Sequence, residues 1–349
     1  MSNNSLSNAF RSVPLFLAIL AVAGCASLPN SQRSPAKLNG SLWWVTPDDA
    51  HRPIESWKAD LDALQALDIS LLVLNGPFVG EDLAAGQTDP MEAFFAEADR
   101  RHLSLYLDTL SAPNWWTLTD PAPEVARART RIQRLQQRYG KHPSFSGWYI
   151  PYELYVFWGA QADLLRTLYR DISAACKEAA PTRPVLISPF FILDKAGNLG
   201  DFRWATPEEY QAFWTETLRA TSIDCVALQD SGEHLSCYTL DDRRPFFAAM
   251  KNACKASGKT LWANVEMGEL DVASIDAYVA RFGRKTTVND PVTASSWRGV
   301  PAEKLRGKLR LAGEYCPTAI SWGYREFVRP SLGPTSAQLY QEYHAILAR

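Results

Sequence analysis

The segment Phe145-Ser-Gly-Trp-Tyr-Ile-Pro-Tyr-Glu153 places a carboxylate at the end of an apolar, aromatic-rich stretch that is typical of a buried strand. A second segment, Leu261-Trp-Ala-Asn-Val-Glu266, repeats this arrangement later in the chain. A carboxylate in this position is poorly suited to packing, because burial without a partner is costly. It is well placed to face a pocket. In a (β/α)₈ barrel the chemistry lies at the C-terminal ends of the strands, so both segments favour that fold.

Strand-like runs and helical patterns alternate along the chain after residue 38. The predicted strands are 40–45, 70–75, 103–108, 147–152, 185–188, 225–229, 260–265 and 319–322. The predicted helices are 54–67, 90–101, 123–139, 163–179, 207–221, 241–257, 302–315 and 336–347. This alternation predicts a parallel sheet, and eight units predict an α/β fold, a closed (β/α)₈ TIM barrel in one domain over residues 38–349. The alternative is an open doubly wound sheet, but no glycine-rich phosphate loop follows the first strand.

The alternation of side chains along each strand indicates where the polar residues point. Side chains of a strand alternate between its two faces. In 103–108 the leucines share one face, and Asp108 lies on the other. The same parity places Glu153 and Glu266 on the inward faces of their strands. We therefore expect Asp108, Glu153 and Glu266 to point inward at the same end of the barrel.

Local signals mark several helix ends. Thr206-Pro-Glu-Glu209 predicts a capping box with proline at the first helical position. Gly140 and Gly258 follow predicted helices, where a left-handed residue is expected.

The composition is that of a globular protein with a full core. The net charge is −2 and 46% of the residues are hydrophobic. The basic residues are dispersed, so no nucleic-acid partner is expected. The chain has 12 tryptophans, many of them near predicted strand ends or loops, where flat rings could stack on sugars. Tryptophans that simply pack between barrel and helices are the alternative.

The N-terminal segment has the features of a targeting signal. Arg11 precedes a short apolar run, Val13 to Gly24, which is too short to span a membrane as a helix. The run ends in Leu20-Ala-Val-Ala-Gly-Cys25, which resembles the bacterial lipobox. We expect 1–24 to be a lipoprotein signal peptide, Cys25 to be lipidated, and 25–37 to be a flexible tether. The protein would then be lipid-anchored in the bacterial cell envelope, on a periplasmic or outer-membrane face. An ordinary secretory signal is the alternative.

Five cysteines follow Cys25, and the sequence does not determine which of them form disulfides. Because their number is odd, at least one free thiol is predicted. The sequence contains no CxxC motif and no cysteine–histidine cluster. We therefore predict neither a metal site nor a cofactor.

Residues 38–349 resemble the DUF4434 family, a TIM-barrel group related to glycoside hydrolases. The resemblance rests on the segments 143–153, 261–266 and Leu228-Gln-Asp-Ser231. The chain also resembles retaining glycosidases of the large barrel clan, whose acid/base ends the fourth strand and whose nucleophile ends the seventh. It departs from that clan at Tyr152, which stands where an asparagine usually precedes the glutamate.

The resemblance implies a glycosidase acting on a polysaccharide, with Glu153 as acid/base and Glu266 as nucleophile. Other polar and aromatic residues near strand ends are candidates for contacts with the sugar. These predicted substrate-binding residues are Trp43, Trp44, Asn75, Asp108, Trp115, Trp116, Tyr149, Tyr152, Trp158, Gln229, Asp230, Asn264, Trp322 and Tyr324. For the carboxylates, salt bridges to Arg243, Arg298 or Arg325 are the structural alternative.

Two other functions remain open at this point. One is a lipid-anchored polysaccharide-binding protein on a barrel that has lost its activity, because a fold does not fix a function. The other is a metal-dependent deacetylase or phosphodiesterase. The second lacks a histidine-rich ligand set, since the five histidines are scattered and only His234 lies near a strand end.

Overall fold

The computed structural model describes residues 34–81, 86–113, 115–230 and 234–347. Eight strands form a closed parallel barrel in the order β1-β10-β7-β6-β5-β4-β3-β2. The strands are β1 (Lys37–Trp44), β2 (Leu71–Asn75), β3 (Ser104–Asp108), β4 (Phe145–Ile150), β5 (Val185–Ile187), β6 (Cys225–Gln229), β7 (Thr260–Asn264) and β10 (Thr318–Ser321). The predicted (β/α)₈ fold is confirmed, and each predicted strand overlaps an observed one.

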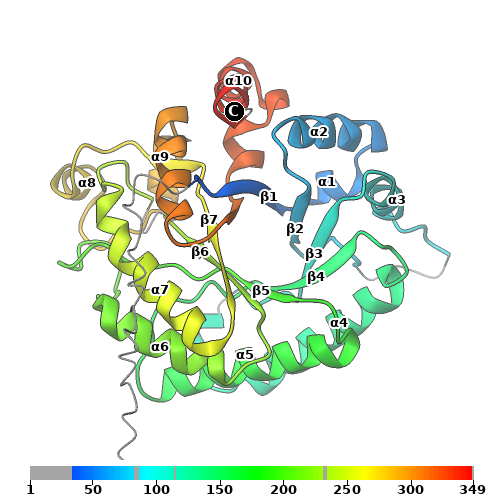
Figure 1. The fold of residues 1–349 in the computed structure, drawn as a ribbon, viewed down its shortest axis with the longest axis horizontal. Coiled ribbons are helices and arrows are strands. Elements are labelled where there is room, and N and C mark those ends of the chain that lie inside the picture. The colour runs from blue at the N-terminus through cyan, green and yellow to red at the C-terminus, as the bar shows by residue number, and fades with distance from the viewer. Residues whose placement is uncertain (1–33, 82–85, 114, 231–233, 348–349) are drawn as a thin grey trace, which may run out of the picture. The chain divides into compact units, whose positions relative to one another are not determined.

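Helices connect successive strands and surround them (Figure 1). The main helices are α2 (Ile54–Ala66), α3 (Glu92–Arg100), α4 (Ala122–Tyr139), α5 (Ala160–Ala179), α6 (Pro207–Arg219), α7 (Arg244–Ser257), α9 (Ala302–Gly313) and α10 (Pro334–Leu347). A short helix, α1 (Pro47–His51), follows β1. Neighbouring strands of the barrel all pair in parallel, so their C-terminal ends share one rim.

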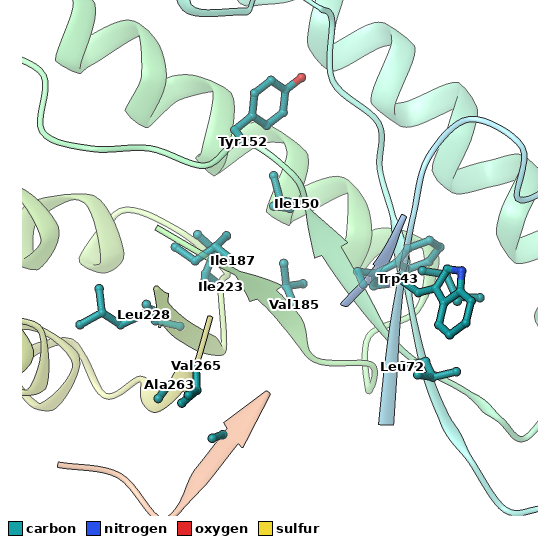
Figure 2. Packing of buried hydrophobic residues seen from close by; sticks show 14 of the residues in the cluster. Trp43, Leu72, Ile150, Tyr152, Val185, Ile187, Ile223, Leu228, Ala263 and Val265 are labelled. Carbon is teal, nitrogen blue, oxygen red and sulfur yellow. The ribbon is translucent and has the colours of Figure 1, made fainter. Parts of the chain in front are cut away.

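Two apolar clusters follow from the alternation of side chains. Inside the barrel, Tyr106, Tyr149 and Trp262 pack with aliphatic residues of the other strands. Outside it, residues of opposite parity pack against the helices, as Figure 2 shows for Leu72, Ile150 and Val185. The inward face predicted for β3, β4 and β7 is therefore the one observed.

The segment between β7 and β10 contains elements that were not predicted from the sequence. These are β8 (Gly268–Leu270), α8 (Ile275–Phe282) and β9 (Trp297–Gly299), and β8 pairs with β9 as a separate antiparallel pair. A third apolar cluster, which includes Leu235, Leu270 and Tyr278, joins this segment to the loops that follow β5 and β6. The two strands are three residues long, too short to produce a periodic pattern in the sequence.

The helix-end predictions are partly confirmed. Thr206 and Glu209 form the predicted capping box. Gly258 is left-handed, with φ of 66°. The prediction for Gly140 is wrong, because its φ is −59°. A glycine is needed there for space, since a Cβ would lie 2.2 Å from the Gln136 carbonyl oxygen.

The predicted signal peptide, the lipidated Cys25 and most of the tether lie outside the described residues. Within the described part of the chain, none of the helices is both long and apolar enough to cross a bilayer.

Candidate active site

Glu153 follows β4 and lies at the rim formed by the C-terminal strand ends. It is exposed to solvent, although protein surrounds it closely enough that burial raises the pKa of its carboxyl. The Tyr149 hydroxyl donates a hydrogen bond to Glu153 Oε1 at 3.3 Å. This bond and one from Gln229 oppose the increase in pKa.

Glu266 follows β7 and is only 2% exposed. Burial raises its pKa well above the usual range, and the charges of Asp230, Glu153 and Glu326 act in the same direction. Lys308 opposes them. Both glutamates follow strands of the same barrel and lie at the rim formed by the C-terminal strand ends. A raised pKa favours the protonated acid, whereas the nucleophile role predicted for Glu266 requires its ionised form.

The raised pKa of Glu266 predicts how stability depends on pH. In the unfolded chain this carboxyl ionises near the ordinary glutamate value of 4.5, whereas the folded protein holds the proton to higher pH. The folded state therefore loses stability as pH rises from 4.5 up to the folded pKa. The loss is about 1.4 kcal/mol for each pH unit in that window. We expect Glu266→Gln to stabilise the protein, and to do so more at pH 7 than at pH 4.

Chemical denaturation of parent and variant across this range checks the prediction. Glu303→Gln is the matched control, because Glu303 is an exposed glutamate on α9. A difference in unfolding free energy between Glu266→Gln and the parent that does not change with pH would contradict it.

A polar network lies below the two glutamates inside the barrel. The Gln229 side-chain amide donates to the Ser188 carbonyl oxygen at 2.9 Å. The Asn264 amide donates to the Ser188 hydroxyl at 3.1 Å, and that hydroxyl donates to the Ala227 carbonyl at 2.9 Å. The Gln229 side chain therefore bonds both to Glu153 and to the Ser188 carbonyl oxygen, which fixes its position. Asn264 lies on the inward face of β7, two residues before Glu266.

A buried ion pair fixes the backbone at Glu266. Asp230 and Lys308 are each 1% exposed, and Lys308 Nζ lies 3.1 Å from Asp230 Oδ1. The same carboxylate oxygen accepts from the Glu266 backbone N–H at 3.0 Å. Lys308 also donates to the Glu266 carbonyl oxygen at 2.7 Å. Asp230 therefore acts on the site through Glu266: its carboxylate pairs with Lys308, and Arg243 donates to its backbone carbonyl oxygen.

Asp108 is likewise engaged by protein groups. It accepts from Arg131 at 3.1 Å and from the Gly76 backbone N–H at 2.8 Å, and it is 1% exposed. Gly76 has φ of 123°, and a Cβ there would lie 2.8 Å from the Val45 carbonyl oxygen. Asp108 thus holds the tight turn after β2, which corrects its predicted role as a sugar ligand. Asn75, at the end of β2, is buried and inward by parity.

Three predicted sugar-binding aromatics pack in the core instead, and this placement corrects the prediction. Trp43 and Tyr324 are fully buried, 6.3 Å apart between ring centroids, on the outward side of the barrel. Tyr152 is fully buried among the residues of Figure 2, and its hydroxyl donates to Glu124 at 2.6 Å. Their burial leaves no ring face for a sugar. Trp43 and Tyr152 have the outward parity of β1 and β4, so strand alternation itself places them against the helices.

Tyr149 is also fully buried, inside the barrel, whereas the remaining predicted aromatics have accessible surface. Trp44, on the inward parity of β1, is 50% exposed. Trp116 is exposed, and Trp115 packs edge-on against Tyr152 with a centroid distance of 5.6 Å. Trp158 is partly buried in the loop after β4.

Trp322 follows β10 and is half-buried against the apolar interior of the barrel. It contacts Trp297, Phe327 and His234 with ring centroids 5.7, 5.9 and 5.6 Å away. Burial lowers the pKa of His234 to about 4, and the charge of Lys308 adds to this effect. His234 is therefore a neutral aromatic neighbour of Trp322 at neutral pH.

Lys308 and Glu326 belong to this region but were missed from the sequence. Lys308 lies among the apolar residues Leu305, Leu309 and Leu311 of α9. A lysine on the buried face of a predicted helix is the sequence feature that could have identified it. Glu326 lies in a π-helical turn, Tyr324–Val328, directly after β10. Burial raises the pKa of Glu326, and its charge in turn raises that of Glu266. π-Helical turns are frequent at functional sites.

No group of three or more metal-ligating side chains occurs among the described histidine, cysteine, aspartate and glutamate residues. In the same part of the chain, no disulfide joins any two of Cys176, Cys225, Cys237, Cys254 and Cys316. Two surface hollows, one on α6 and one beside the end of α9, include none of the predicted site residues. The candidate site is therefore defined by the strand-end rim.

The chain belongs to the DUF4434 family, described as a domain of unknown function, whose model matches residues 38–333. A search of curated proteins gives no match. Among solved structures, a protein described as a "putative alpha-L-fucosidase" from Bacteroides thetaiotaomicron is similar over 99% of both chains, with 18% identity and a TM-score of 0.68.

Two further structures are more distant. The endo-1,4-beta-D-mannanase of Thermotoga petrophila has 13% identity and a TM-score of 0.53, over 88% of this chain and 99% of its own. A GH10 endoxylanase from a sugarcane soil metagenome has 9% identity and a TM-score of 0.51, over 89% and 97%. At these identities the likeness establishes the fold, a barrel like those of these proteins.

Proposed function

We propose that this protein is a glycoside hydrolase that acts on a cell-surface or extracellular polysaccharide through Glu153 and Glu266. The observation that carries the proposal is the pair of carboxyls that follow β4 and β7 on the inward parity of those strands, at the rim shared by the C-terminal strand ends. Glycoside hydrolysis needs two carboxyl groups on either side of the scissile bond. The similarity to glycosidase barrels supports the same reaction class.

In this proposal Glu153 protonates the glycosidic oxygen while Glu266 attacks the anomeric carbon. Glu153 then takes a proton from water, which hydrolyses the glycosyl-enzyme. The raised pKa of Glu153 suits the acid step. Two neighbouring carboxyls disfavour double ionisation, so the pair retains one proton to higher pH than an isolated glutamate would. The reaction requires that proton on Glu153.

Several neighbours support the substrate in this scheme. Tyr149 and Gln229 orient Glu153 by hydrogen bonds. Trp44 is the exposed rim candidate for contact with the sugar, and Trp322 offers a ring at the end of β10, whereas Asn264 and Asn75 are buried.

The stereochemical outcome tests the mechanism. A retaining enzyme places its carboxyls about 5 to 5.5 Å apart, and an inverting one about 6.5 to 9.5 Å. We predict retention, which NMR of the first-formed sugar anomer would establish. Initial release of the opposite anomer would instead assign Glu266 the role of general base.

A non-catalytic polysaccharide-binding protein is the second candidate. The raised pKa of Glu266 favours it, because a protonated carboxyl does not act as a nucleophile. Binding of a glycan without release of reducing ends would support this candidate over the hydrolase.

We also propose that Cys25 anchors the protein to a membrane through attached acyl chains, on the basis of the lipobox-like segment that ends at Cys25. Cys25→Ser is then expected to release a soluble or uncleaved form into a different cell fraction, because it removes the acylated thiol. Fractionation with an acyl-chain label checks this, and a variant that still fractionates and labels like the parent would contradict the anchor. Cys237→Ser, at a site beyond the predicted signal, is the matched control.

A further inference from the structure

A group of aromatic rings lies on the loops that follow β4 and β5, and one of them, Tyr155, follows Glu153 by two residues. Tyr155 is at its centre, with ring centroids of Trp158, Phe190 and Phe202 at 6.5, 5.8 and 6.4 Å. We call these four residues the aromatic platform. Tyr155 is buried, Trp158 and Phe190 are partly buried, and Phe202 is 43% exposed. The platform therefore has a packed base and an open face.

The loop that carries Phe202 is held by its own hydrogen bonds. The buried Asp194 carboxylate accepts backbone N–H groups of Ala196 at 3.2 Å and of Leu199 at 2.9 Å. Gly200 has φ of 62°, and a Cβ there would lie 3.0 Å from the Phe202 ring. The Phe202 ring thus packs against Gly200, in a loop whose backbone is held by hydrogen bonds to Asp194. The exposed Phe202 ring adjoins Phe190, with ring centroids 6.2 Å apart, and we take this surface as a candidate binding surface.

The chemistry around the rings fits a sugar. The Arg203 guanidinium covers one face of the Trp158 ring, 4.2 Å from its centre, and also pairs with Glu209. The Lys195 ammonium lies over the Trp204 ring, 5.0 Å from its centre. A pyranose presents an apolar C–H face to a ring and hydroxyls to donors at its edge. The planes of the Phe202 and Tyr155 rings make an angle of 87°. The rings of the platform therefore do not form one flat apolar surface. A lipid surface or a protein partner would need a broader continuous apolar area.

The platform is continuous with Glu153. Tyr155 follows Glu153 by two residues in the same loop, and the Phe190 backbone N–H donates to the Leu154 carbonyl oxygen at 3.1 Å. Under the proposed function Glu153 protonates the leaving group, so the leaving group begins next to this loop.

We propose that the aromatic platform binds sugar residues on the leaving-group side of the scissile bond. The substrate is then a glycan chain that continues past the cleavage site. The assignment to the leaving-group side rests on the proposed function, whereas glycan binding by the platform does not.

The test uses the full chain with soluble xylan, β-mannan, galactan and fucoidan in affinity gels. We expect the parent to be retarded by at least one of these glycans. Phe202→Ala and Trp158→Ala are expected to bind it about tenfold more weakly, because each removes a stacking ring. Phe202→Tyr keeps a ring and is expected to bind like the parent. Leu332→Ala, which changes an exposed apolar residue on Pro330–Leu332, is the matched control. Circular dichroism verifies that each variant is folded.

Failure of the parent to bind any of the four glycans, or parent-like binding by both alanine variants, would overturn the proposal. If the platform binds a glycan and no reducing ends are released, the proposed hydrolase function is contradicted. The proposal that the platform binds glycans is then still supported. If the parent cleaves a glycan, Phe202→Ala is expected to lower kcat/KM about tenfold more for an oligosaccharide than for an aryl glycoside, whose leaving group is not a sugar. Equal losses on both substrates would overturn the assignment to the leaving-group side.

Discussion

Glu266→Gln is expected to lower kcat/KM by about 10⁴-fold or more on every glycan the parent cleaves, while glycan affinity is retained. The change removes the nucleophilic carboxylate and keeps the side-chain shape. Glu153→Gln is expected to lower kcat/KM by about 10²- to 10⁴-fold on oligosaccharides, and much less on activated aryl glycosides. Only the oligosaccharide needs a proton on its leaving group. Kinetics on both substrate types measure the difference.

Small nucleophiles separate the two roles further. Azide is expected to restore part of the turnover of Glu153→Ala on an aryl glycoside, because it attacks the glycosyl-enzyme without needing a general base. In Glu266→Ala, azide would attack the substrate directly and give the opposite product anomer. Glu326→Gln is an informative comparison, because Glu326 is a third carboxyl near Glu266. Suppose that Glu326→Gln lowers kcat/KM by about 10⁴-fold and that Glu266→Gln is nearly as active as the parent. The nucleophile would then be Glu326 rather than Glu266.

Lys308→Met is expected to lower the free energy of unfolding by about 3 to 5 kcal/mol. It leaves the Asp230 carboxylate buried without its ion-pair partner, and removing one member of a buried pair costs this much. It also removes the bond from Lys308 to the Glu266 carbonyl oxygen, so kcat is expected to fall as well. Denaturant titration near neutral pH gives the stability change.

Two variants control this result. Arg310→Met changes an exposed cation on the same helix and is expected to leave stability within about 0.5 kcal/mol of the parent. Asp230→Asn combined with Lys308→Met removes both charges and is expected to recover part of the loss. A cost for Lys308→Met no larger than that for Arg310→Met would show that the pair does not stabilise the fold.

The barrel was predictable because its signals are local and repeated. Each strand is a short apolar run between helical patterns, and the parity of Leu103, Leu105 and Leu107 correctly indicated which face of β3 meets the helices. The same parity gave the inward direction of Asn264 on β7. Tyr152 also follows this alternation, because it has the outward parity of Ile150. The alternation fails at Tyr324, which lies beyond β10 and packs outward although it has the inward parity of Ile320.

The partners of the site carboxylates could not be predicted, because they come from distant parts of the chain. Asp230 pairs with a lysine 78 positions away, and Asp108 pairs with Arg131 on the helix after β3. The spacing of these residues in the sequence does not reveal which of them pair. Each buried carboxylate needs a partner, because an unpaired buried charge destabilises the fold. The aromatic platform was also missed in part, because Phe190 and Phe202 acquire their role only through the folding of the loop around Asp194.

The most direct test of the two-glutamate hydrolase is the release of reducing ends from the glycan panel by the parent and by the Glu153→Gln/Glu266→Gln double variant. We predict that the parent releases reducing ends from at least one glycan and that the double variant binds the same glycan without cleaving it. Equal cleavage by the double variant would place the catalytic residues elsewhere. A glycan that the parent binds and never cleaves would contradict the enzyme and favour the binding protein.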